Sequence, residues 1–142
     1  MSTLPSISRQ PIGRKFRILV ADDQVLIRNV VRSILEENAR FDVCGEATNG
    51  AIAVAEAQRL KPDVVILNIS MPVLGGMAAA REIKSKMPHC AIIILSSHAD
   101  QRFIEEAKKI GVRAYVAKAN AAGALVKAID LAVLGGDFVV VD

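Results

Sequence analysis

The stretch DVVILN, residues 63–68, decides the fold of this chain. Its four successive apolar residues, Val64 to Leu67, are typical of a strand that is buried on both faces of a parallel sheet. Two further runs have the same character, ILVA at 18–21 and AIIIL at 91–95. Strands of this kind require helices on both faces of the sheet, so the sequence predicts an α/β domain.

Segments with helical periodicity alternate with these apolar runs. In VLIRNVVRSILEEN, residues 25–38, apolar side chains recur at helical spacing, and we expect Val30, Ile34 and Leu35 on the buried stripe. We expect further helices at 51–60, 77–87, 100–110 and 122–134, and further strands at 41–47 and 112–118. Strand–helix pairs joined by right-handed crossovers predict a doubly wound, five-stranded parallel sheet.

The positive charge of the chain is concentrated at its start. The chain has 142 residues, which is enough for one domain with a substantial core, and a net charge of +3. Residues 1–17 hold 4 of the 18 Lys and Arg residues and no acid, so the rest carries 14 basic against 15 acidic residues. A DNA-binding fold concentrates basic residues on its folded body, so we expect no direct contact with nucleic acid.

Compartment and domain limits follow from the remaining composition. No apolar run is long enough to cross a bilayer and no secretory signal opens the chain, so we expect a cytoplasmic protein without a membrane anchor. Cys44 and Cys90 are expected as reduced, buried thiols. Residues 1–14 indicate a flexible leader, 15–134 the folded domain, and 135–142 a carboxyl-terminal extension or the start of a linker.

The segment DFVVVD, residues 137–142, is apolar and favours a strand. No helix-turn-helix pattern follows it, so we expect no output domain within this chain. An exposed FVVV stretch is able to pair with the edge strand of a second copy, and a strand-mediated homodimer is therefore a further hypothesis.

Polar side chains stand at the carboxyl ends of the predicted strands. The first strand ends in Asp22 and Asp23, the third in Asn68, the fourth in Ser96 and the fifth in Lys118, whereas the second contributes little charge. In an open parallel sheet, ligands bind beyond these ends. Adjacent carboxylates suit a hard divalent cation such as Mg²⁺, and a lysine with a hydroxyl suits an anion beside it. Singly, the two acids would also serve as a helix N-cap, but the combination favours a ligand site.

The motifs ILVADDQ, VVILNISMPVLGG, AIIILSS and AYVAK resemble those of the receiver domain of two-component response regulators. The resemblance covers residues 16–134, and AYVAKAN, which lacks a proline after the lysine, is most similar to receivers of LuxR-type transcription factors. It implies a flavodoxin-like (βα)5 fold with strand order 2-1-3-4-5. It also implies a regulatory domain rather than an enzyme, with Mg²⁺ as cofactor and a histidine kinase or phosphotransfer protein as partner.

The resemblance implies roles for the residues of the site. Asp23 would bind Mg²⁺ directly and Asp22 largely through water, with the backbone carbonyl of Ser70 and the residue at position 68 as further ligands. Lys118 would hold a phosphoryl oxygen. The family carries its phosphoacceptor aspartate where this chain has Asn68.

Two further groups of residues are implied by the same resemblance. Ser96 and Tyr115 would act as the switch, because the hydroxyl would move to the phosphoryl group and the ring would swing inward with it. Ser70, Ser97 and His98 would tune the lifetime of the phosphoryl group, although an exposed loop residue is the plainer interpretation of His98.

Asn68 changes the chemistry that the resemblance implies. A neutral amide forms no acyl phosphate, and the loss of one carboxylate weakens Mg²⁺ binding. One hypothesis is an engineered Asp-to-Asn variant, because every partner residue remains; we then expect the inactive-like conformation, with Tyr115 outward and Ser96 away from the site. A second is a natural receiver that acts by interaction alone. A third, a flavodoxin-like or dinucleotide-binding enzyme, is disfavoured because the turn VADDQVLI contains no glycine to admit a phosphate.

Overall fold

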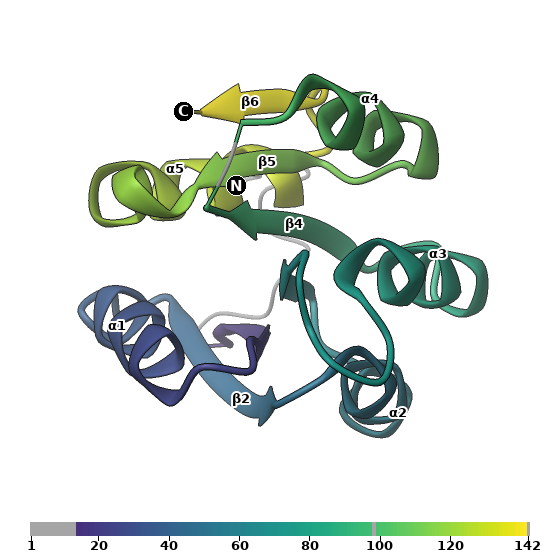
Figure 1. Cartoon of the computed structure of the whole chain (residues 1–142). Helices are drawn as coiled ribbons and strands as arrows, with labels where there is room; N and C mark the ends of the chain where they lie inside the picture. Colours follow the sequence, from purple (N-terminus) through teal and green to yellow (C-terminus); the bar gives the residue numbers. More distant parts are fainter. Residues whose placement is uncertain (1–13, 98, 142) are drawn as a thin grey trace, which may run out of the picture.

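The computed structural model describes residues 14–97 and 99–141. These residues form a single parallel sheet in the order β2-β1-β3-β4-β5-β6 (Figure 1). The predicted order 2-1-3-4-5 is confirmed, and a sixth strand extends the sheet beyond β5. The strands are β1 Phe16–Ala21, β2 Phe41–Ala47, β3 Val64–Asn68, β4 Ala91–Ser96, β5 Ala114–Ala117 and β6 Val139–Val141.

Helices cover both faces of the sheet. In Figure 1, α1 and α5 lie on one side and α2, α3 and α4 on the other. The helices are α1 Val25–Glu36, α2 Gly50–Leu60, α3 Gly76–Lys86, α4 Gln101–Ile110 and α5 Ala121–Val133, with a short 3-10 turn, η2, at Lys118–Asn120. In the described part of the chain, no helix combines the length and the apolar character needed to cross a membrane.

The core consists of two apolar layers, one on each face of the sheet. Alternate residues of the central strands enter each layer: Ile66 packs with α1 and α5, and Leu67 packs with α2 and α3. Every residue of β3 and β4 is buried, as the continuous apolar runs predict. Complete burial of one such Leu or Ile side chain contributes about 1.5–3 kcal/mol.

Local features of the sequence set the start of α2 and the ends of α2 and α4. Asn49 caps α2, since its side chain accepts a hydrogen bond of 2.8 Å from the backbone nitrogen of Ile52. Lys61, before Pro62, ends α2 in the left-handed region at φ 50°. Gly111 ends α4 at φ 101°, a conformation that glycine adopts without steric cost.

One expectation about the core is wrong. Val30 is 54 % exposed, whereas Val31 and Leu35 face the sheet. Val30 shares the exposed side of α1 with Val25 and Leu26, which are also largely exposed. The helix therefore has an apolar surface that the domain itself does not cover.

The carboxyl-terminal segment, which the sequence indicates as strand-forming, contains the sixth strand. Val139–Val141 runs parallel to β5, with Val140 opposite Tyr115. The backbone nitrogen of Val139 donates to the carbonyl of Arg113 at 3.1 Å. The apolar stretch that we expected to be free for a second copy therefore pairs with an edge strand of its own chain.

Candidate functional site

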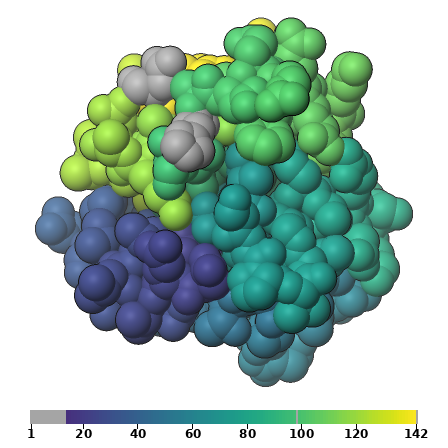
Figure 2. Space-filling model, viewed as in Figure 1, coloured from purple at the N-terminus to yellow at the C-terminus, as the bar shows by residue number. Residues whose placement is uncertain are grey.

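The register of the sheet brings the predicted site residues to one edge. Ala21 pairs with Leu67, so Asp22 and Asn68 follow their strands at the same level. Ser96 pairs with Ala117 at the end of β4 and β5, next to Lys118. On the face shown in Figure 2, the purple, teal and yellow-green parts of the chain meet.

A hollow of about 210 Å³ lies at this edge. Most of the residues that we predicted for the site line it, whereas Asp22 and Tyr115 are buried behind it. His98, predicted as a tuning residue, lies outside the described residues. The lining residues are Asp23, Gln24, Asn68, Ile69, Ser70, Ser96, Ser97, Phe103 and Lys118.

Asp22 is a buried carboxylate held by a cation and by the backbone. Asp22 is 2 % exposed, and its Oδ2 lies 3.0 Å from Nζ of Lys118. Oδ1 accepts a hydrogen bond of 2.9 Å from the backbone nitrogen of Gln24. Among the described residues, Oδ2 has an ion-pair partner but no aligned hydrogen-bond donor. This oxygen is therefore buried and held by the ammonium group of Lys118.

Asn68 faces two oxygens at the end of β3. It is 7 % exposed. Its Nδ2 donates to the carbonyl of Ser70 at 2.8 Å and to Oδ1 of Asp23 at 3.4 Å. Both acceptors are oxygens that we expected to bind Mg²⁺, so the amide occupies their lone pairs with an N–H donor.

The predicted switch residues contact each other in the interior. Tyr115 is 1 % exposed, so the expectation of an outward Tyr115 is wrong. A hydrogen bond joins its hydroxyl to Ser96, which is also buried. Burial raises the pKa of the Tyr115 phenol, and the bond to Ser96 opposes that rise. The ring fills the apolar layer shared by α2, α3 and α4, whose packing favours the inward position.

The loop between β3 and α3, residues 69–75, is tightly folded against the site. The backbone nitrogen of Leu74 donates to the carbonyl of Pro72 at 2.7 Å, which places Val73 at the centre of a three-residue turn with φ 69°. This conformation is strained for a β-branched residue. A Cβ on Gly76 would overlap the carbonyl oxygen of Asn68, so only glycine allows α3 to begin here.

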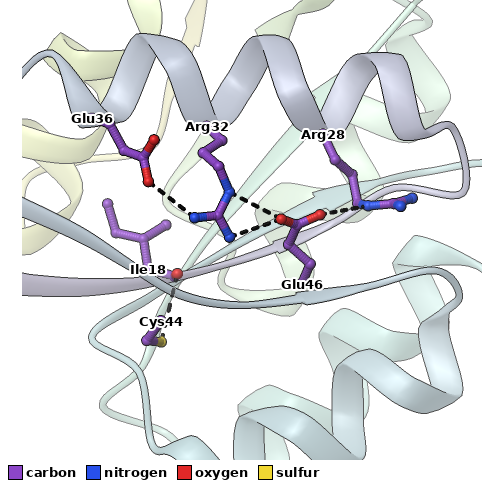
Figure 3. Close-up of polar contacts among 6 residues, drawn as sticks. All are labelled: Ile18, Arg28, Arg32, Glu36, Cys44 and Glu46. Atoms are coloured by element: carbon purple, nitrogen blue, oxygen red, sulfur yellow. Dashed lines mark hydrogen bonds and ion pairs between the residues drawn. The ribbon is translucent and has the colours of Figure 1, made fainter.

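Sequence reasoning missed Arg28, which links α1 to the acidic end of β1. Its Nε donates to Glu46 at 2.7 Å, as Figure 3 shows, and another nitrogen donates to the carbonyl of Asp22 at 2.7 Å. Arg32 also donates twice to Glu46. These hydrogen bonds hold the pKa of Glu46 below its usual range. The sequence did contain a signal for this contact: two arginines spaced four apart on one helix, and a single acid, Glu46, near the end of the following strand.

A larger hollow, of about 810 Å³, lies at the opposite edge of the sheet. Lys84 and Arg113 line it and donate to the carbonyls of Pro88 and Gly136, in the segments that follow α3 and α5. Cys90 also lines it, and burial raises the pKa of this thiol to about 12. This hollow brings together helix ends rather than the predicted polar site.

The comparisons with known proteins agree with this geometry. The sequence profile of the response regulator receiver domain matches residues 18–130. The chain belongs to the response regulator receiver domain family. It is 35 % identical over 114 residues to the chemotaxis protein CheY of Thermotoga maritima, covering 80 % of this chain and 94 % of that protein.

Other relatives of this receiver domain are transcription regulators. The chain is 30 % identical over 133 residues to DegU of Brevibacillus brevis, which covers 94 % of this chain and 56 % of DegU. It spans about half the length of the transcriptional regulators that it matches. A LuxR-family response regulator from Aurantimonas sp. has a similar structure, with a TM-score of 0.82 and 28 % identity over 87 % of this chain and 88 % of that one.

Receiver domains bind Mg²⁺ at an acidic site, and this site fits such an ion only in part. The carboxylates of Asp22 and Asp23 would suit a cation, although Oδ2 of Asp22 is buried and already paired with Lys118. The amide of Asn68, however, directs an N–H at Asp23 and at the carbonyl of Ser70. The lone pair of an amide nitrogen is delocalised into its carbonyl group and does not bind a metal, and Mg²⁺ takes oxygen ligands in near-octahedral geometry. Among the described residues, no three His, Cys, Asp or Glu side chains cluster to hold a metal ion.

Proposed function

We propose that this receiver domain carries Asn68 at the phosphoacceptor position and transmits its signal by protein interaction, without accepting a phosphoryl group. The single observation that carries the proposal is the place of Asn68 at the end of β3, where it contacts Asp23 and lines the hollow with it. An amide nitrogen is a poor nucleophile, and an amide oxygen forms no stable acyl phosphate.

The inward Tyr115 favours an interaction module over a domain held in the inactive-like state. Tyr115 and Ser96 are both buried with an amide at position 68. The alternative, an Asp-to-Asn variant of a domain that is normally phosphorylated, is supported by Asp22, Asp23 and Lys118, which all lie at the site. In that case, a single substitution would restore phosphate transfer.

The partners follow from the family and from α1. Receiver domains interact with histidine kinases or phosphotransfer proteins. The exposed Val25, Leu26 and Val30 give α1 an apolar surface beside the site edge. We place docking of such a partner on this surface and expect the protein to act in the cytoplasm.

Phosphoryl transfer from a small phosphodonor tests the proposal. The chain, Asn68→Asp and the double variant Asn68→Asp with Lys118→Ala would each receive Mg²⁺ and the donor, and intact mass would be recorded. We expect the chain to gain no phosphoryl group. A gain by Asn68→Asp that the double variant lacks supports the blocked-acceptor alternative. No gain by Asn68→Asp supports the interaction module, and a gain by the chain itself contradicts both.

A further inference from the structure

We propose that the side-chain amide of Asn68 takes the place of the divalent cation in this receiver domain and holds the β3–α3 loop without Mg²⁺. The proposal deepens the proposed function and rests on Asn68 lying at the acceptor position. In this proposal Asn68 does more than remove the nucleophile of the family: its amide also positions the loop.

The first support is the direction of the amide. A cation at this site would draw together the carboxylate of Asp23 and the carbonyl of Ser70. The Nδ2 of Asn68 contacts the same pair, at 3.4 Å and 2.8 Å. Its two hydrogens can serve the two acceptors separately. One neutral donor group thus joins the two oxygens that a metal would otherwise join.

The second support is the charge of the site. Lys118 is paired with Asp22. Of the two acids at the site, Asp23 is therefore the one without an ion-pair partner among the described residues. With Asn68 in place of a third carboxylate, no pair of unpaired acids remains to repel each other in the absence of a cation. The need for a bound ion, which such repulsion creates, is therefore removed.

The third support is the loop that the amide holds. Val73 lies at φ 69° and is 81 % exposed, so neither its backbone preference nor its burial favours this conformation. Such strain persists only where surrounding contacts determine the backbone. The backbone nitrogen of Gly50 donates to the carbonyl of Leu74 near the end of the loop, and that of Gly76 donates to the carbonyl of Ile69 at its start.

Asn68 also holds the start of this loop. The side-chain amide of Asn68 donates a hydrogen bond to the carbonyl of Ser70, the second residue of the loop. For Mg²⁺ to enter, the amide would have to turn its oxygen toward the metal and give up its bonds to Ser70 and Asp23. Binding of the ion would therefore compete with the contacts that already hold the loop.

Hydrogen exchange and Mg²⁺ titration of the full chain test this inference directly. We expect the thermal midpoint and the amide exchange of residues 69–76 to be the same in chelator and in millimolar Mg²⁺, with no calorimetric binding signal. A Mg²⁺-dependent rise in midpoint, or a slower exchange of this loop with Mg²⁺, would overturn the proposal without any substitution.

Two variants test the role of the amide. In chelator, Asn68→Asp should exchange residues 69–76 at least about tenfold faster, because two hydrogen bonds are lost, and Mg²⁺ should reverse the change. Asn68→Ala should show the same acceleration without a comparable reversal. Unchanged hydrogen exchange in β2 and α2 would show that each variant is folded. Loop exchange in both variants equal to that of the chain would refute the positioning role.

The outcome is separable from that of the proposed function. Phosphoryl gain by the chain would contradict the proposed function in the mass assay. A Mg²⁺ response of the chain without phosphoryl gain would contradict only the role of the amide.

Discussion

Replacement of Glu46 by Gln will weaken the link between β2 and α1 while leaving the side chain nearly the same size. Glu46 accepts from Nε of Arg28 at 2.7 Å and from two nitrogens of Arg32 at 3.0 and 2.8 Å. Arg28 also holds the carbonyl of Asp22. The substitution therefore removes the charge that orients Arg28 beside the acidic end of β1.

The expected loss is about 2 kcal/mol of unfolding free energy. Hydrogen bonds to charged groups contribute about 1.5–3 kcal/mol, against about 1 kcal/mol for neutral ones. The side chains of Arg28 and Glu46 are 13 % and 30 % exposed, so their contact retains much of this difference. The pair with Arg32 is more exposed and adds at most about 1 kcal/mol. For a domain of this size, 2 kcal/mol lowers the thermal midpoint by roughly 6 °C.

The dependence on pH identifies the charge as the cause. Hydrogen bonds, first from Arg28, lower the pKa of Glu46 in the folded chain from an ordinary 4.5. The folded state thus binds the proton less readily than the unfolded state, so the stabilisation is complete above pH 4.5 and is lost as the pH falls through the lowered pKa. The difference between chain and variant should shrink in acid.

Urea denaturation of the chain, Glu46→Gln and Glu36→Gln between pH 7 and pH 4 measures this effect. Glu36 is a matched control, because it contacts Arg32 at 3.0 Å on the exposed side of α1. Its loss should cost less than about 0.5 kcal/mol. Equal losses for the two variants at pH 7, or a loss for Glu46→Gln that does not change with pH, would refute the reasoning.

Three further substitutions and one deletion have expected outcomes. In chelator at neutral pH, Asn68→Asp should have a thermal midpoint several degrees lower than the chain by calorimetry. The new carboxylate would lie beside that of Asp23, and two charges 3.4 Å apart repel by about 1–5 kcal/mol. Equal midpoints would contradict this. Gly76→Ala should lower the unfolding free energy measured in urea by at least about 3 kcal/mol, because the added Cβ would overlap the carbonyl oxygen of Asn68. Gly123→Ala, which has open space around it, should raise the unfolding free energy by about 0.5–1 kcal/mol. Deletion after Gly135 exposes the edge of β5 and should raise the mass in light scattering; an unchanged mass at high concentration would count against this.

Much of the fold was predictable because burial leaves a direct trace in the sequence. β3 and β4 are apolar at nearly every position, and helices need polar residues on one side, so the two kinds of element differ in period. The site was predictable for the same reason. Parallel strands end at one edge, so Asp22, Asn68, Ser96 and Lys118 had to meet once the strands were identified.

The remaining features depend on contacts that a linear pattern does not contain. β6 has three residues, and its existence depends on the free edge of β5 rather than on periodicity. Val30 has helical spacing, yet spacing alone does not say where the apolar stripe ends. The inward Tyr115 and the direction of the Asn68 amide are rotamer choices set by neighbouring groups.

The direction of β6 decides on which side of the domain the chain leaves the sheet. α5 returns the chain to the edge opposite the site, and β6, running parallel to β5, carries it back by roughly 10 Å toward Ser96 and Lys118. A fluorophore attached after Val141 would therefore stand on the same side as the hollow and could sense a bound partner. The same dye attached after Gly135 would report from the far side.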